Sequence, residues 1–296
     1  MSHRAAVLTM LVATLLWSIA GVVTLRLESA RSFEVTFWRS FFNAVALVVL
    51  LSWLRGARPV WQAIARRGAT LWLSGLCWSV MFTAFMLALT LTQVANVLVT
   101  MALAPLLTAL MARFGLGLRQ PRRTWMAVAV AGAGIAWMYG REVSSADPRH
   151  LLGSLVALGV PIAAAMNWTV IQASRDAAEH DLLPAVLIGA VLSALATLPL
   201  ALPFTGSAHD IGLLALLGVA QLAIPCLMAV AAARSLSAPE VSLLALLEIV
   251  FGVAWPWLAG QSVPATHVLV GGLVVLLALA ANEAAALRHR GRRRGS

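Results

Sequence analysis

Glu248 needs a chemical explanation, because it is the one carboxylate near the middle of a long apolar run, Leu243–Gly260. If that run lies in a bilayer, ionising the carboxylate there costs at least about 2.5 kcal/mol, so such a group usually has a function. Ala245 and Gly252 share its helix face and are small enough to let a neighbouring helix approach. We therefore expect Glu248 to face protein rather than lipid. Two hypotheses stay open: it couples proton movement or binds an ammonium group, or it makes a structural hydrogen bond.

Three tryptophans, Trp17, Trp78 and Trp168, lie deep in three different apolar runs rather than at their ends. Trp78 begins a row with Phe82 and Phe85 at helical spacing, and the other two have small or polar neighbours. Core packing explains any one aromatic side chain, whereas three deep tryptophans on separate helices also suit the wall of a cavity. The predicted binding residues are Trp17, Trp78, Phe82, Met101, Asn167 and Trp168, with further polar contacts from Asn96, Thr100 and Gln172.

Arg39 lies about one turn inside the end of its apolar run, with Asn43 one turn deeper on the same face. Its guanidinium could bind a carboxylate, extend to the membrane interface or hydrogen-bond to a neighbouring helix. Five of the six histidines lie in loops or tails and the other, His267, lies at the very start of the last apolar run, so we expect no buried proton relay, no metal site and no cofactor. The sequence also pairs no histidine with a serine in the middle of a run, which argues against an intramembrane hydrolase.

The composition assigns the chain to the membrane class. Of its 296 residues 61% are hydrophobic and 11% are charged, whereas about 25% are charged in a soluble domain. Cys77 and Cys226 both lie inside apolar runs, which excludes a disulfide scaffold. The net charge of +10 comes from arginines in short loops and in a basic tail, a distribution typical of membrane topology signals rather than of nucleic-acid binding.

The apolar runs predict an all-α membrane protein with ten transmembrane helices in two inverted five-helix repeats. The first repeat occupies 1–140 and the second 151–287, with a connecting loop at 141–150 and a basic tail at 288–296. An odd number of spans in each half makes the two halves cross the bilayer in opposite directions. The predicted spans are 5–25, 35–54, 69–90, 94–114, 122–140, 151–173, 182–202, 210–234, 239–259 and 265–287.

The arginines predict the orientation. Most of them fall in the segments that lie on the same side as the N-terminus, and the positive-inside rule makes that side the cytoplasm. Both termini are therefore expected to be cytoplasmic. The loops predicted on the opposite side hold four arginines: Arg26, Arg31, Arg141 and Arg149.

Aligning Ala95–Leu110 with Pro239–Ala254 pairs Leu103 with Leu247, in agreement with two related halves. Inverted repeats are typical of transporters, whose substrate sites lie near the midplane between the repeats. Three mid-span prolines are predicted hinges, since each frees a backbone carbonyl and bends its helix: Pro105, Pro161 and Pro225. A ridge of small residues in the fifth span suits packing or a weak dimer, so we expect a monomer or a weak homodimer.

The chain resembles the EamA-type drug/metabolite transporter superfamily. The resemblance rests on the ten-span pattern and on Leu15–Val23, Phe37–Val48, Leu103–Met111 and Leu246–Gly260, and the chain looks most like the YddG-type aromatic amino-acid exporters. Two positions depart from the family pattern: Ile249 follows Glu248 where many members have proline, and Gln261 stands where many have a second glutamate. A role that the family gives to that second glutamate does not carry over.

The resemblance implies a multi-pass transporter in the bacterial inner membrane that exports amino acids by alternating access, with the substrate and the lipid bilayer as its partners. Aromatic or large apolar amino acids are the expected substrates, and small neutral ones remain possible. A multidrug or other metabolite exporter is the alternative, and a membrane scaffold or intramembrane enzyme is a third hypothesis. The sequence lacks a Walker motif, so ATP is not the expected direct energy source.

Overall fold

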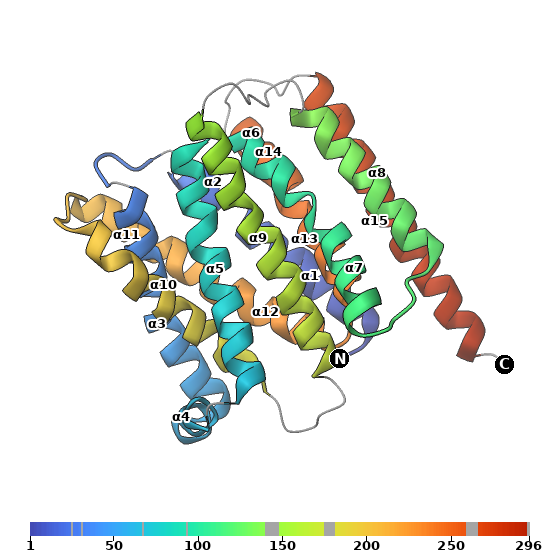
Figure 1. Ribbon diagram of the computed structural model, residues 1–296, viewed down its shortest axis with the longest axis horizontal. Coiled ribbons are helices and arrows are strands. Elements are labelled where there is room, and N and C mark those ends of the chain that lie inside the picture. Colours follow the sequence, from blue (N-terminus) through green and yellow to red (C-terminus); the bar gives the residue numbers. More distant parts are fainter. Residues whose placement is uncertain are drawn as a thin grey trace.

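The computed structural model describes residues 1–24, 26–30, 32–66, 68–92, 94–139, 148–174, 181–258 and 266–294. Every regular element within these ranges is a helix (Figure 1). In chain order they are α1 (His3–Trp17), α2 (Ala20–Thr24), α3 (Ser32–Arg55), α4 (Ala57–Ala65), α5 (Ala69–Leu91), α6 (Val94–Met101), α7 (Ala104–Gly115), α8 (Arg122–Tyr139), α9 (Pro148–Ala173), α10 (Leu183–Ala201), α11 (Ala208–Leu216), η1 (Leu217–Ala223), α12 (Ile224–Ala233), α13 (Ala238–Ala245), α14 (Leu247–Leu258) and α15 (Thr266–Arg294).

Seven helical segments in the described part of the chain are long and apolar enough to cross a membrane: His3–Thr24, Phe33–Arg55, Ala69–Ala88, Val97–Gly115, Leu151–Ala173, Leu183–Ala201 and Ala208–Ala233. They correspond to predicted spans one to four and six to eight. The other three predicted spans coincide with α8, the pair α13–α14, and α15, in which Thr266–Asn282 is a shorter apolar stretch. The all-helical fold is confirmed for the described residues, whereas the count of ten spans and the inverted repeats stay predictions.

Several predicted spans are interrupted. α6 ends at Met101 and α7 begins at Ala104, with Pro105 in its first turn. The ring of a proline clashes with the carbonyl four positions back, and its nitrogen has no hydrogen to donate. Pro225 likewise opens α12 and follows a π-helical stretch, η1. Pro161, in contrast, lies inside a continuous α9. Two of the three predicted hinge prolines therefore coincide with a helix irregularity.

Two further breaks have no proline inside them. α13 and α14 meet at Leu246, and α1 and α2 are separated at Ser18 and Ile19. The Ser18 hydroxyl donates to the Leu15 carbonyl at 2.7 Å and accepts from Trp255 Nε1 at 2.8 Å. A serine side chain that bonds the backbone in this way competes with helix continuation, and the tryptophan from α14 holds it in place.

Residues 57–65 were expected to lie in a loop and instead form α4, a short helix with one apolar face. Pro59 in its first turn is compatible with helix initiation. Val60 is buried, whereas Trp61 on the neighbouring face is 53% exposed. The loop expectation was wrong because nine residues of amphipathic sequence are too few to stand out beside the long apolar runs.

The helices that surround the centre of the molecule come from both halves of the chain. α5 packs against α9 and α10, and α1 packs against α12, while α8 and α15 lie side by side at one edge (Figure 1). The α5–α10 contact is close because glycines face it: a Cβ at Gly189 would stand 2.3 Å from Trp78 Cβ, and one at Gly75 would stand 2.6 Å from Ile188 Cγ2. This close approach fixes the position of Trp78.

Two buried carboxylates join the α2–α3 loop to the α10–α11 loop. Asp210 accepts hydrogen bonds from the backbone N–H groups of Glu28, Ser29 and Ala30 at 2.8–3.0 Å and from the Ser29 hydroxyl at 2.9 Å. Glu34 accepts from the N–H groups of Thr205 and Gly206 at 2.9 and 2.8 Å. We call Glu34, Asp210 and the two loops the carboxylate clasp.

Ser207 is the N-cap of α11, and Asp210 completes its capping box. Ser237 and Glu240 form the equivalent box at the start of α13.

Candidate binding site

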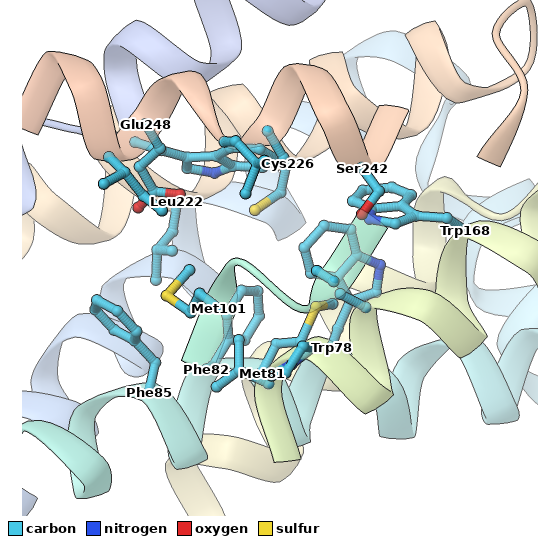
Figure 2. Close-up of a pocket in the computed structure, with 18 of the residues that line it drawn as sticks. Trp78, Met81, Phe82, Phe85, Met101, Trp168, Leu222, Cys226, Ser242 and Glu248 are labelled. Carbon is cyan, nitrogen blue, oxygen red and sulfur yellow. The ribbon is translucent and has the colours of Figure 1, made fainter. Parts of the chain in front are cut away.

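A cavity of about 120 Å³ lies between helices from the two halves of the chain. Figure 2 shows α5 side chains on one side of it and Ser242 and Glu248, from α13 and α14, on the other. Its wall is largely aromatic and aliphatic: Trp17, Trp78, Met81, Phe82, Phe85, Met101, Ala104, Val160, Pro161, Ala164, Trp168, Leu222, Cys226, Ala245, Leu246 and Ile249, together with the polar residues Arg39, Gln221, Ser242 and Glu248.

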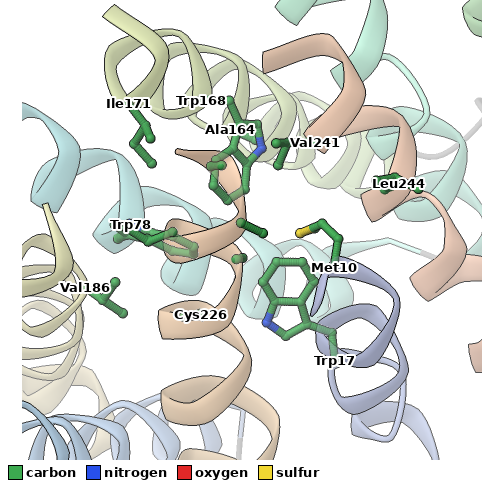
Figure 3. Close-up of a cluster of buried hydrophobic side chains, with 14 of the residues drawn as sticks. Met10, Trp17, Trp78, Ala164, Trp168, Ile171, Val186, Cys226, Val241 and Leu244 are labelled. Atoms are coloured by element: carbon green, nitrogen blue, oxygen red, sulfur yellow. The ribbon is translucent and has the colours of Figure 1, made fainter. Parts of the chain in front are cut away.

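The three deep tryptophans converge on this cavity from α1, α5 and α9 (Figure 3). Trp78 and Trp168 pack edge to face with ring centroids 5.6 Å apart, and Trp78 lies 5.5 Å from Phe82. Trp17 is the last residue of α1, so the α1–α2 break follows directly behind it. All three rings belong to the same buried cluster, so they serve both as core and as cavity wall.

Of the residues predicted to bind substrate, Trp17, Trp78, Phe82, Met101 and Trp168 line the cavity, whereas Asn167 is not part of its wall. Asn167 is fully buried, and its Oδ1 accepts from the Ser74 hydroxyl of α5 at 2.6 Å. Gln172, expected to add a polar contact, instead accepts from the N–H of Ala238 at 2.6 Å and ties α9 to α13.

Two other side chains expected to make polar contacts with a substrate, Asn96 and Thr100, are not among the described residues of the cavity wall. The side chain of Asn96 lies outside the described residues, and Thr100 is not part of the described cavity wall. Among the predicted hinges, Pro161 lines the cavity itself. Pro105 follows the lining residue Ala104, and Pro225 precedes the lining residue Cys226.

The polar part of the wall consists of other side chains. Arg39 is 2% exposed and does not reach the interface; its Nη2 donates to the Phe82 carbonyl at 3.3 Å. Gln221, in η1, donates through Nε2 to the Trp17 carbonyl at 3.2 Å. Gln221 and Ser242 were missed, although a lone amide in the apolar stretch 210–234 is itself a signal of an intramembrane polar contact.

Glu248 lies in the first turn of α14, directly after the break at Leu246, and its side chain lines the cavity. The N-terminal end of a helix carries a partial positive charge, which favours a carboxylate there. No described residue donates a hydrogen bond to this carboxylate, and Arg39 lines the same cavity. The structure thus places Glu248 in the protein interior, facing the cavity that the tryptophans also line.

No group of three or more histidine, cysteine or acidic side chains that could hold a metal ion occurs among the described residues. Cys77 and Cys226 are both free and buried. The chemistry that the cavity offers is therefore apolar burial, aromatic contact and two opposite charges.

Comparison with known proteins agrees with this arrangement. A solved structure called "Crystal structure of protein" matches 96% of this chain and 98% of its own length, with a TM-score of 0.80 and 19% sequence identity, a likeness that shows the fold alone. No curated protein matches the chain. Residues 4–140 match the family model described as "EamA-like transporter family". The match covers slightly less than half of the chain, and it makes this N-terminal part similar to that family of transporters.

Proposed function

We propose that the protein exports amino acids with aromatic or large apolar side chains across the bacterial inner membrane, by alternating access around the tryptophan-lined cavity. The observation that carries the proposal is the convergence of Trp17, Trp78 and Trp168 on one interior cavity that also holds polar side chains. Small-molecule sites have this composition: a predominantly apolar wall with a few polar groups that fix orientation.

The apolar wall suits an aromatic or branched side chain. Aromatic pairs prefer edge-to-face or offset contacts, which the Trp78 and Trp168 faces offer to a third ring. Met81 and Met101 are flexible and polarisable, so they adapt to side chains of different shape. Such a pocket discriminates weakly among large apolar substrates, since one methylene changes binding by only about 1–3 kcal/mol.

Alternating access is supported by where the helices break. The alignment that pairs Leu103 with Leu247 brings the α6–α7 break at residues 102–103 onto the α13–α14 break at residue 246. The α5–α9 contact likewise corresponds, under the proposed inverted repeat, to the α12–α1 contact. Broken helices that meet at a central site are typical of transporters whose halves rock against each other.

The proposed orientation places both termini in the cytoplasm, which cysteine labelling checks. In a background with Cys77 and Cys226 replaced by alanine, a membrane-impermeant maleimide applied to intact cells is expected to label Ser207→Cys and to spare Gln62→Cys and Gln120→Cys. Ser145→Cys, outside the described residues, is expected to behave like Ser207→Cys. Labelling of the two glutamine positions from outside would invert the orientation.

Counterflow into proteoliposomes tests the function. Vesicles preloaded with unlabelled phenylalanine are expected to accumulate external radiolabelled phenylalanine, tryptophan and leucine transiently, while protein-free vesicles do not. The panel also contains threonine, glutamate and the lipophilic cation tetraphenylphosphonium. Transport of the cation without any amino acid would favour the multidrug alternative, and transport of none of them would contradict the proposal.

A further inference from the structure

Two side chains of opposite charge, Arg39 and Glu248, lie on the wall of the same otherwise apolar cavity. They come from different halves of the chain, on α3 and α14. No hydrogen bond or ion pair joins them among the described residues. The wall of one cavity therefore carries a positive and a negative group that are not joined by direct contact.

Both groups have unused hydrogen-bonding capacity. A guanidinium carries five N–H donors, and Arg39 uses one of its nitrogens on the Phe82 carbonyl while its buried Nε has no partner. Gln221 Oε1 and Ser242 Oγ, also on the wall, are buried acceptors without a partner among the described residues. Buried polar atoms without partners destabilise the protein, so a ligand that reaches them gains binding energy.

The charged and aromatic parts of the wall are separated. In Figure 2 Glu248 lies toward one end of the cavity, with Leu222 and Phe85, and Trp168 lies toward the other, beside Trp78. Arg39 bonds to the carbonyl of Phe82, one turn further along α5 from Trp78 and close in sequence to Phe85. A molecule with a compact dipolar head and an apolar ring could place the head between Arg39 and Glu248 and the ring between the tryptophans.

We propose that Arg39 and Glu248 recognise the two charges of the amino-acid head group: Arg39 binds the α-carboxylate and Glu248 binds the α-ammonium group. This inference rests on the proposed function and names the part of the substrate that the aromatic wall does not explain. The two side chains together carry no net charge, and neither does a zwitterionic amino acid, so loading the cavity adds no net charge to the low-dielectric interior. Each charge then gains a charged hydrogen-bond partner, the strongest kind of hydrogen bond in proteins.

Three ligands that differ only in the head group test the assignment: phenylalanine, 3-phenylpropionate, which lacks the ammonium group, and phenethylamine, which lacks the carboxylate. Binding of each radiolabelled ligand is measured on purified protein in lipid nanodiscs. Glu248→Gln is expected to weaken phenylalanine and phenethylamine about tenfold or more and to change phenylpropionate by less than about threefold. Arg39→Gln is expected to weaken phenylalanine and phenylpropionate by a similar factor and to spare phenethylamine.

Matched controls are Glu28→Gln and Arg58→Gln, which remove the same charges at exposed positions and are expected to leave all three affinities unchanged. Arg39→Lys keeps the positive charge and is expected to bind phenylpropionate better than Arg39→Gln does. If Arg39→Gln does not fold, the affinities of Glu248→Gln for the three ligands test the assignment.

Equal losses for all three ligands in either cavity variant would mean that the charges are structural, and would overturn the assignment while leaving the proposed function intact. A parent protein that binds none of the three ligands would instead contradict the proposed function itself.

Discussion

Trp78→Ala is expected to lower the transport of phenylalanine and tryptophan about tenfold or more, and that of threonine by less than about threefold. The indole of Trp78 faces Trp168 and Phe82 across the aromatic end of the cavity, so its loss removes ring contacts that only a large substrate makes. Threonine is smaller, so it is expected to make little contact there and to depend mainly on the polar part of the wall. The measurement is the ratio of variant to parent flux for each substrate, per amount of monodisperse protein.

Trp72→Ala is the control, because Trp72 lies on the same helix and is 38% exposed. It is expected to leave the flux ratios uniform. Trp78 is also part of the core, so its removal is expected to cost about 3–5 kcal/mol of stability, which a melting curve in detergent records. A uniform fall in flux for all substrates, alongside that loss of stability, would show that Trp78 only supports the fold.

Asp210→Asn is expected to lower the stability of the protein by about 2–4 kcal/mol, several degrees in melting temperature. The Asp210 side chain is fully buried, and its two oxygens accept four hydrogen bonds from the α2–α3 loop. An amide has one oxygen, and its NH₂ group would face N–H donors. At least one backbone N–H would therefore lose its partner.

The control for Asp210 is Glu28→Gln. The Glu28 side chain is 68% exposed and lies 3.9 Å from the imidazole of His209, so its charge contributes little. Thermal unfolding followed by circular dichroism compares the two variants. If Asp210→Asn melts with the parent, the carboxylate clasp does not hold the two loops together.

The sequence predicts the helices well where hydrophobicity alone determines their bounds. The run predicted at 69–90 is α5, Ala69–Leu91, and the one at 182–202 is α10, Leu183–Ala201. The break before Pro105 also agrees with local chemistry, because proline lacks the N–H of a helical hydrogen bond and its ring crowds the carbonyl four residues back. The break at Ser18 does not, since it depends on Trp255, which is 237 residues away along the chain.

The candidate site also has residues that the sequence predicts and residues whose contacts depend on the folded chain. Deep tryptophans are visible in the sequence because they depart from the interfacial positions that tryptophan normally occupies. The partners of polar side chains are set by which helices come together, so Asn167 and Gln172 proved to bind Ser74 and the Ala238 backbone rather than face the cavity. The hydrogen bonds of Glu34 and Asp210 join segments that are far apart along the chain, so the sequence alone does not predict them.

The proposed substrate site is tested most directly by locating where an amino acid binds to the protein. Photo-leucine, a leucine analogue that carries a diazirine, is added to the purified protein, irradiated and located by mass spectrometry of the labelled peptides. We predict adducts on the α5 segment that holds Trp78, Met81 and Phe82 and on Met101, and their loss in excess phenylalanine. Adducts that excess phenylalanine does not reduce, on exposed α15 residues such as Leu273 and Leu277, would contradict a binding site in the cavity.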